Sequence, residues 1–418
     1  MTVIYNLGLS LYSVALGLAS LWNPKAKLWV DGRKNLLSRI REKAGKQGQS
    51  IIWMHCASLG EFEQGRPVIE AIKKEYAGYK ILITFFSPSG YEIRKNYQGA
   101  DYIFYLPVDS RNNAREFMEI VRPQLAIFVK YEFWYHYLTE LRARNVPTIL
   151  LSGVFRQNHP FFKPWGGFWR SMLDCFQVIF VQDPNSAKLL QSIGLDQKTI
   201  VSGDTRFDRV LDLSKNAAKL PLIEKFCNNH KVVVAGSTWV EDDEVMDHFA
   251  KSNRDVRFVI APHEILETRI KEVEKLYTNT IRFSAWKEDQ ENPENKNVLI
   301  IDNIGMLATL YQYADITFIG GAFGGDGIHN VLEAVVYYKP VVYGPNHEDF
   351  GEAVELVDIG AAETVENALE LEKVFRTLLD DANLRKEKGR IAGNYVRAKA
   401  GATSIVMQYI QEKRLLTS

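Results

Sequence analysis

The stretch that decides the fold is IIWMHCASLGEFEQGRP, residues 51–67. Its apolar start, Ile51 to Met54, is typical of a buried strand, and the segment after Ser58-Leu59-Gly60 has the pattern of an amphipathic helix. Glu61 lies where that helix opens. A carboxylate in this position either caps the helix or lies at the mouth of a ligand site, and the remaining sequence has to distinguish the two.

The same alternation of apolar strand and amphipathic helix continues along the chain. Helices are expected at 61–76, after Pro88 and at 133–144, each behind an apolar run. The pattern pauses near 205–220 and restarts with KVVVAGS at 231–237. Such alternation predicts an α/β fold with parallel sheets and crossover helices.

We therefore predict two Rossmann-like, doubly wound domains that face a cleft, at residues 46–210 and 211–418. Ligands of such sheets bind at the carboxyl ends of the strands, here across the cleft. The second domain is expected to end with a helix over roughly 383–414.

The composition is that of an ordinary globular protein. The 418 residues are enough for two domains, and Lys+Arg and Asp+Glu are balanced at 51 each. A chain without net positive charge lacks the basic surface that extensive nucleic-acid binding needs. Three scattered cysteines, Cys56, Cys175 and Cys227, predict neither a disulfide framework nor a metal site and favour a reducing compartment.

Residues 1–45 differ from this average. No charged side chain occurs between Met1 and Asn23, and a helix from Val3 to Trp22 would reach about 30 Å, the thickness of a bilayer's hydrocarbon core. Basic residues dominate the segment that follows: Lys25, Lys27, Arg33, Lys34, Arg39, Arg41, Lys43 and Lys46. This pattern predicts a membrane anchor, spanning or monotopic, with a cytoplasmic basic flank. A helix packed on the protein is the alternative.

Three strand-to-helix junctions share one spacing: Ser58-x-x-Glu61, Thr238-x-x-Glu241 and Asn330-x-x-Glu333. Each taken alone fits a helix-capping box. Together, at the same edge of two parallel sheets, they indicate a ligand site. The third junction also contains five glycines between residues 320 and 327, which let a ligand approach the backbone, and a helix start near Asn330 would suit a phosphate.

Neither a Walker phosphate loop nor a metal site is predicted. The pattern G-x-x-x-x-G-K-[ST] is absent from the sequence, and GGAFGG is only a loose match to the dinucleotide fingerprint. Asp242 and Asp243 lie at a predicted helix start, where we expect them to be solvated.

Further motifs follow one another in a fixed order: KLWVDGRKN (27–35), SLGE (58–61), SPSGYE (87–92), YLPVD (105–109), YEFW (131–134), SGDTRFD (202–208) and GGAFGGDGIHNVLEAVVYYKPVVYGP (320–345). This series resembles the Kdo transferases, the 3-deoxy-D-manno-octulosonic acid transferases of lipopolysaccharide assembly. The resemblance implies a GT-B glycosyltransferase that needs no metal or other cofactor. It implies transfer of Kdo, with inversion, from CMP-Kdo to a lipid A precursor at the cytoplasmic face of the inner membrane.

The resemblance also implies the site residues. Glu61, in SLGE, corresponds to the family's catalytic base, and Glu132, in YEFW, corresponds to its second acidic residue. Implied donor contacts are Ser237, Thr238, His263, Gly320, Gly321, Gly325, His329, Asn330 and Glu333. Gly60, Arg156 and Arg206 are candidates for contacts to a phosphate or to the acceptor.

The chain departs from the family pattern at Ala261-Pro262-His263, where the family often has P-R-H, and at 151–156, where N-A-R-x-S is common. An arginine for the donor phosphate is therefore missing. Two other functions stay open: a GT-B transferase or epimerase that uses a UDP-sugar, and a membrane-anchored binding or scaffold protein. Preferential stabilisation by UDP would favour the first, and absence of any nucleotide effect would favour the second.

Overall fold

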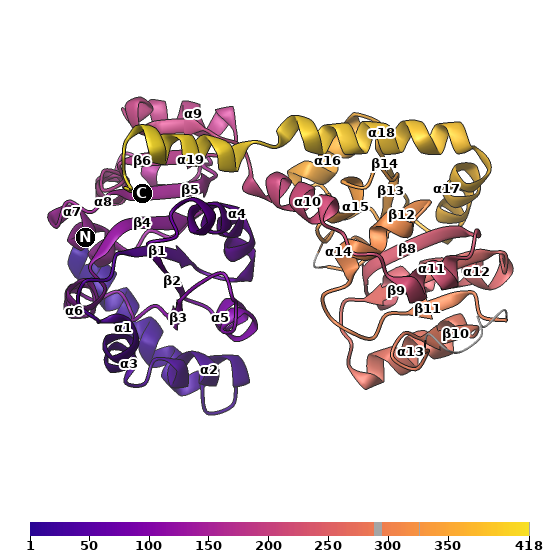
Figure 1. Cartoon of the computed structure of the whole chain (residues 1–418), viewed down its shortest axis with the longest axis horizontal. Helices are drawn as coiled ribbons and strands as arrows, with labels where there is room; N and C mark the ends of the chain where they lie inside the picture. The colour runs from indigo at the N-terminus through magenta and orange to yellow at the C-terminus, as the bar shows by residue number, and fades with distance from the viewer. Residues whose placement is uncertain (288–294, 326, 418) are drawn as a thin grey trace. The chain divides into compact units, whose positions relative to one another are not determined.

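The computed structural model describes residues 1–287, 295–325 and 327–417 (Figure 1). The chain divides into two compact units, which we call the N-terminal unit (Met1–Arg209 with Ala400–Ser418) and the C-terminal unit (Val210–Lys399). This division differs from the predicted domain limits at both ends of the chain. Residues 1–45, predicted as a separate anchor segment, and the residues from Ala400 on, predicted in the second domain, both lie in the N-terminal unit.

The N-terminal unit is built on a parallel seven-stranded sheet with the order β3-β2-β1-β4-β5-β6-β7. Its strands are β1 (Ile51–Cys56), β2 (Lys80–Phe85), β3 (Tyr102–Tyr105), β4 (Pro123–Val129), β5 (Thr148–Gly153), β6 (Val178–Val181) and β7 (Thr199–Val201). Its helices are α1 (Thr2–Ala19), α2 (Pro24–Gly32), α3 (Leu36–Ala44), α4 (Leu59–Glu75), α5 (Pro88–Arg94), α6 (Arg111–Val121), α7 (Tyr135–Ala143), α8 (Gly167–Leu173), α9 (Pro184–Gln191) and α19 (Ala402–Glu412). Helix α10 (Thr205–Lys215) crosses the limit between the units.

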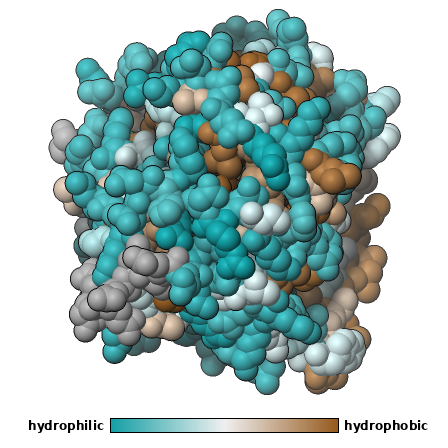
Figure 2. Space-filling model, turned by 90° about the vertical axis from the view of Figure 1, so that its right-hand side faces the viewer, coloured by the Kyte–Doolittle hydropathy of each residue, from teal (hydrophilic) through white to brown (hydrophobic). Residues whose placement is uncertain are grey.

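The C-terminal unit repeats this architecture with the order β10-β11-β9-β8-β12-β13-β14. Its strands are β8 (Lys231–Thr238), β9 (Val256–Pro262), β10 (Thr280–Arg282), β11 (Val298–Ile300), β12 (Ile316–Ile319), β13 (Val341–Tyr343) and β14 (Ala362–Thr364). Its helices are α11 (Pro221–Cys227), α12 (Val240–Ser252), α13 (Glu267–Tyr277), α14 (Leu307–Leu310), α15 (Leu332–Val335), α16 (Gly351–Asp358), α17 (Ala368–Asp380) and α18 (Ala382–Lys399). The face of this unit shown in Figure 2 is mostly hydrophilic. The prediction of two parallel, doubly wound sheets is confirmed.

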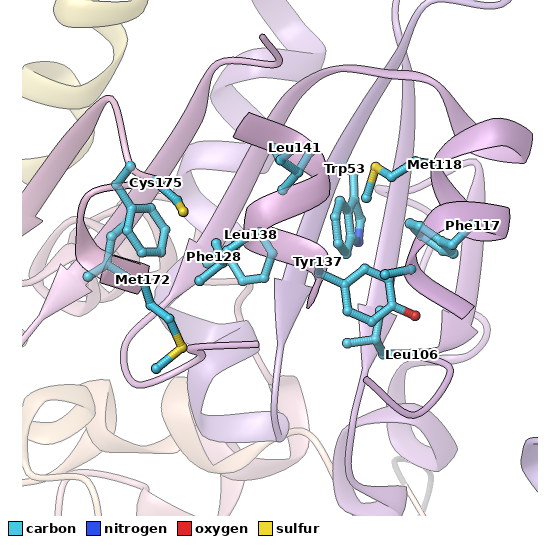
Figure 3. Close-up of a cluster of buried hydrophobic side chains, with 14 of the residues drawn as sticks. Trp53, Leu106, Phe117, Met118, Phe128, Tyr137, Leu138, Leu141, Met172 and Cys175 are labelled. Atoms are coloured by element: carbon cyan, nitrogen blue, oxygen red, sulfur yellow. The ribbon is translucent and has the colours of Figure 1, made fainter. Parts of the chain in front are cut away.

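Both faces of the N-terminal sheet are buried, which explains the uninterrupted apolar run of β1. Alternate residues serve opposite cores: Trp53 packs on the side of α6 and α7, and Met54 on the side of α4 and α19. In Figure 3 Trp53 lies among Phe117, Phe128 and Tyr137, with ring centroids 4.8, 5.1 and 5.7 Å away. This core fixes the strand from which the Glu61 segment leaves.

The expected C-terminal helix is two helices. Gly401 has a φ of 120°, a backbone conformation that favours glycine, and it separates α18 from α19. Helix α19 then packs on α4 through Val406 and Ile410. The chain therefore returns to the N-terminal unit at this glycine.

Helix α1 has the length and the apolar composition of a membrane span, and none of its residues is fully buried. One end is nevertheless fixed to the N-terminal unit. The Tyr5 hydroxyl donates to Asp109 Oδ2 at 2.6 Å, and Asn6 Oδ1 lies 2.7 Å from His136 Nε2. Further along, Tyr12 packs on Trp29. The helix thus lies along the protein and leaves its other face exposed.

Candidate active site

Both sheets have a topological switch point, and the residues singled out from the sequence lie beside it. In the N-terminal sheet the strand order reverses between β1 and β4, which precede Glu61 and Glu132. In the C-terminal sheet it reverses between β8 and β12, which end at Thr238 and just before Gly320. Open parallel sheets bind ligands at this position, outside the carboxyl ends of the strands.

Glu61 does cap the helix that it opens. Its Oε2 accepts from the Ser58 backbone N–H at 3.0 Å and from the Ser58 hydroxyl, which completes a capping box at the start of α4. No described residue donates a hydrogen bond to Oε1, and the side chain is half-buried. One carboxylate oxygen is therefore used by the fold, and the other is available to a ligand.

Glu132 lies near Glu61 and is more deeply buried, at 8% exposure. Its Oε2 lies 2.9 Å from His55 Nε2 and accepts from Trp134 Nε1 at 2.7 Å. Burial raises the pKa of the Cys56 thiol well above its usual value, and the negative charges of Glu61 and Glu132 raise it further. The thiol therefore has both carboxylates as neighbours.

The three other residues predicted for this unit differ in their surroundings. Gly60 lies exposed in the first turn of α4. Arg156 is exposed beyond β5, and its charge opposes the rise that burial causes in the pKa of Tyr131. Arg206 forms an ion pair with the buried Asp204, at 2.7 Å. A phosphate would therefore compete with a carboxylate for Arg206.

In the C-terminal unit the capping pattern is shifted by one residue from the predicted Thr238-x-x-Glu241. The Trp239 N–H donates to Asp242 Oδ2 at 2.8 Å, so that Trp239 is the N-cap of α12. Ser237 has a φ of 56°, in the left-handed region, and the helix starts one residue later than predicted. Thr238 is fully buried.

The prediction that Asp242 and Asp243 are solvated is wrong, because both are fully buried. Asp242 Oδ2 also accepts from the Gly321 N–H at 2.8 Å, which ties the start of α12 to the glycine loop. Asp243 pairs with Arg269 and accepts from the Tyr277 hydroxyl at 3.0 Å. Charged side chains at a helix start are usually solvated, and these two are buried because each has its own donors.

The glycine loop is tightly folded where it leaves β12. A Cβ on Gly320 would collide with the Ser237 carbonyl, and Gly321 has a φ of 96°. By contrast, nothing lies within 4 Å of a Cβ placed on Gly325. A cavity of about 640 Å³ adjoins this open part of the loop, lined by Gly325, Gly327, residues 345–350 and Glu366.

Three aromatic rings form a stack beside the loop. The His263 ring stacks against both Trp239 and His329, with centroid distances of 4.6 and 4.4 Å. The Trp239 indole N–H donates to His329 Nε2 at 3.1 Å, and the His329 N–H donates to the Gly320 carbonyl at 3.2 Å. The structure thus brings His263, His329 and the glycine loop together.

Asn330 and Glu333 contact each other, with Asn330 Nδ2 donating to Glu333 Oε1 at 3.1 Å. The helix predicted to start near Asn330 is α15, and it has only four residues. A helix this short has a small dipole, so its predicted role in binding a phosphate loses its physical basis. Sequence reasoning missed His55 and Trp239, because their partners in the site, Glu132 and His329, are remote in the chain. It included Trp134 in the YEFW motif but did not predict that its indole N–H donates to Glu132.

The N-terminal unit matches a known family. Residues 34–209 match the model described as 3-Deoxy-D-manno-octulosonic-acid transferase (kdotransferase). The 3-deoxy-D-manno-octulosonic acid transferase of Haemophilus influenzae is 24% identical over 89% of this chain and 91% of its own. A bifunctional glycosyltransferase/methyltransferase of Fusobacterium nucleatum is 27% identical over 81% of this chain. That protein is longer, and the match covers 54% of its length.

Solved structures show the fold. A putative UDP-N-acetylglucosamine 2-epimerase from Listeria monocytogenes superposes with a TM-score of 0.61 at 12% identity, over 89% of this chain and 98% of that one. A glycosyltransferase from Rickettsia africae gives 0.56 at 15% identity, over 89% and 100%. The GT-B fold class predicted from the sequence is confirmed. The resemblance predicted from the motifs is confirmed as well, and the chain is a relative of the Kdo transferases whose N-terminal unit contains their family domain.

Proposed function

We propose that this protein transfers Kdo from CMP-Kdo to a lipid A precursor of the lipid IVA type, with inversion at the anomeric carbon. The observation that supports this most directly is the position of Glu61. It lies in the family domain, beside the switch point of the sheet, with Oε1 open to a ligand. A binding or scaffold protein would have no use for a half-buried carboxylate oxygen held in this place.

In the proposed reaction an acceptor hydroxyl attacks the anomeric carbon of Kdo, and Glu61 Oε1 takes the hydroxyl proton. The bond between that carbon and the phosphate oxygen breaks, and CMP leaves with the electron pair. General base catalysis of this kind is worth about 10²–10⁴-fold in rate. Glu132, whose Oε2 is already occupied, is proposed to orient the acceptor through its other oxygen.

The donor is proposed to bind in the C-terminal unit, at the glycine loop and in the adjoining cavity. The first turn of α12 is acidic, and Asp242 already accepts the N–H of its N-cap, Trp239, so this helix start is a poor phosphate site. The stacked His263 and His329 rings are better placed to take over from the missing arginine. A proton on one ring would supply a cation, whereas two charged rings at 4.4 Å would repel each other.

The test is to incubate detergent-solubilised protein with a CMP-Kdo generating system and a lipid A precursor, and to determine product masses. An added Kdo mass supports the proposal. Thermal unfolding with CMP and with UDP then identifies the donor nucleotide. A larger shift with UDP would overturn the CMP-Kdo assignment in favour of a UDP-sugar enzyme, and no shift with either would favour a scaffold.

Helix α1 is proposed to lie in the membrane interface instead of crossing it, on the cytoplasmic face of the inner membrane. A spanning helix would have to leave the protein, and Asp109, at 2% exposure, would lose the Tyr5 hydroxyl. Meanwhile Leu7, Leu11 and Leu18 are 58–61% exposed and would enter one leaflet. An epitope tag before Met1 tests this: in-plane binding keeps the tag on the side of the catalytic units, and a spanning helix moves it to the opposite side.

A further inference from the structure

A chain of buried hydrogen bonds ends at Glu132. The Trp53 indole N–H donates to Thr84 Oγ1 at 2.8 Å, and Thr84 Oγ1 lies 2.9 Å from His55 Nδ1. His55 Nε2 then lies 2.9 Å from Glu132 Oε2. Trp53, Thr84 and His55 are all fully buried. The sheet places them together, because Trp53 and His55 lie on β1 and Thr84 pairs with His55 on β2.

The donors and acceptors in this chain of hydrogen bonds favour a proton on His55 Nε2. An indole nitrogen can only donate, so Thr84 Oγ1 is an acceptor toward Trp53 and has its own proton to donate to Nδ1 of a neutral ring. The Thr84 carbonyl, 3.1 Å from Nδ1, can accept a proton from the charged ring. In both of these states, Nε2 keeps its proton and donates it to Glu132. In the other neutral tautomer, a bare Nε2 would accept from Trp134 Nε1 but would turn a lone pair toward the Glu132 carboxylate.

We propose that His55 is a positioning residue for Glu132. Together with Trp134 it holds Glu132 Oε2 with two N–H donors and so fixes the orientation of the carboxylate, with Oε1 directed to the acceptor sugar. His55 itself is fully buried, so it acts only through Glu132. This inference rests on the proposed function, in which Glu132 orients the acceptor.

Two variants form a matched pair. The amide nitrogen of His55→Gln reaches the position of Nε2 and can still donate to Glu132, whereas that of His55→Asn reaches only the position of Nδ1, toward Thr84. We expect His55→Asn to lower kcat by about 10- to 100-fold with an unchanged KM for CMP-Kdo. His55→Gln should stay within about threefold of the wild type in kcat. Equal rates for the two variants, in a preparation whose wild type transfers Kdo, would overturn the proposal.

The protonation state can be measured without activity. In wild-type protein labelled with ¹⁵N-histidine, the ¹⁵N chemical shifts of the His55 ring should show a protonated Nε2. The His55 signals are identified because they are absent from the spectrum of His55→Gln. A bare Nε2 that accepts from Trp134, 2.9 Å away, would overturn the proposal whether or not the protein transfers Kdo. Absence of Kdo transfer by the wild type, with Nε2 protonated, would instead count against the proposed function and leave the hydrogen-bond arrangement supported.

Discussion

At the scale of single residues, the proposed function would give Glu61 a chemical role beside its structural one. The capping box uses Oε2, and catalysis would use Oε1. The two roles can be separated, because glutamine is also accepted at this position of a capping box but cannot take a proton at neutral pH.

We expect Glu61→Gln to unfold within about 1 kcal/mol of the wild type and to lose about 10²–10⁴-fold in kcat. Ser58→Ala is the matched control, since it removes the hydroxyl of the cap and keeps the carboxylate. It should lose about 1 kcal/mol of unfolding free energy and most of its turnover should remain. Thermal unfolding and initial rates with CMP-Kdo check both variants. Near-normal turnover of Glu61→Gln would restrict Glu61 to capping.

A second residue-scale prediction concerns Asp243. Burial raises its pKa from 3.8 to about 7, although Arg269 lowers it. The folded unit therefore holds a proton that the unfolded chain releases above about pH 4, so this group's stabilisation is complete below that pH and is lost as the pH rises toward 7. Over that range the unfolding free energy should fall by up to about 1.4 kcal/mol per pH unit.

Asp243→Asn should flatten this dependence, and urea unfolding between pH 4.5 and about pH 8 would measure it. The exposed Asp255 offers the control substitution, Asp255→Asn, which should leave the slope unchanged. An equal slope in the Asp243→Asn protein would show that Asp243 is ionised throughout.

The sequence predicted where the candidate residues lie in the sheets better than it predicted their surroundings. Gly320 follows β12 directly, Ser237 lies at the end of β8, and Glu61 lies in the first turn of the helix after β1, so local pattern alone placed them at a sheet edge. The contact between His55 and Glu132 joins residues 77 positions apart, and it exists only because β1 and β4 are neighbours. Similarly, the burial of Asp243 depends on Arg269 from α13, which no local pattern reveals.

At the scale of elements, the strands could be predicted because both sheet faces are covered and their sequences are uniformly apolar. The break between α18 and α19 near the end of the chain could not be predicted, because it depends on tertiary contacts as well as on Gly401. Asp208, in the SGDTRFD motif, caps α19 from outside: Oδ1 accepts from the Gly401 N–H at 2.6 Å, and Oδ2 from the Thr403 N–H at 2.7 Å.

Asp208→Ala should therefore loosen α19. Loss of a helix cap costs about 1 kcal/mol, so the amides of the first turn of α19, from Thr403 on, should exchange hydrogen about fivefold faster. Asp212→Ala is the control, because Asp212 lies on the same helix and is exposed at its side chain by 65%. Unchanged exchange in Asp208→Ala would mean that packing on α4 alone holds α19.

At the scale of the whole molecule, the sequence showed an apolar helix with a basic flank, and the structure restricts which charges are available to lipid. Arg33 is half-buried, and its guanidinium lies over the rings of Trp29, Phe86 and Tyr105. It also donates to the carbonyls of Trp29, Phe86 and Leu106, so its hydrogen bonds are made within the protein. Burial lowers its pKa to about 9. Lys34 pairs with Asp31, and Arg41 pairs with Glu116.

Of the other basic residues, Lys25 and Lys27 lie next to the apolar helix in the chain. They lie at the start of α2, close behind the exposed Trp22, and no described residue forms an ion pair with either. If α1 lies in the interface, these two lysines should be near the lipid head groups. Each is then worth about 1 kcal/mol toward an anionic surface, an attraction that is screened over about 10 Å at 0.1 M salt.

The double variant Lys25→Gln/Lys27→Gln should bind anionic vesicles about 30-fold more weakly at low salt, bind neutral vesicles like the wild type, and lose this difference as salt is added. Co-sedimentation with vesicles of both compositions measures it. The control is Lys373→Gln/Lys386→Gln, which removes two exposed lysines from the C-terminal unit. An equal loss on neutral vesicles would mean that the substitutions disturb α2. A loss shared by the control would mean that lipid attracts the protein through its overall charge, and the flat orientation of α1 would then have no electrostatic support.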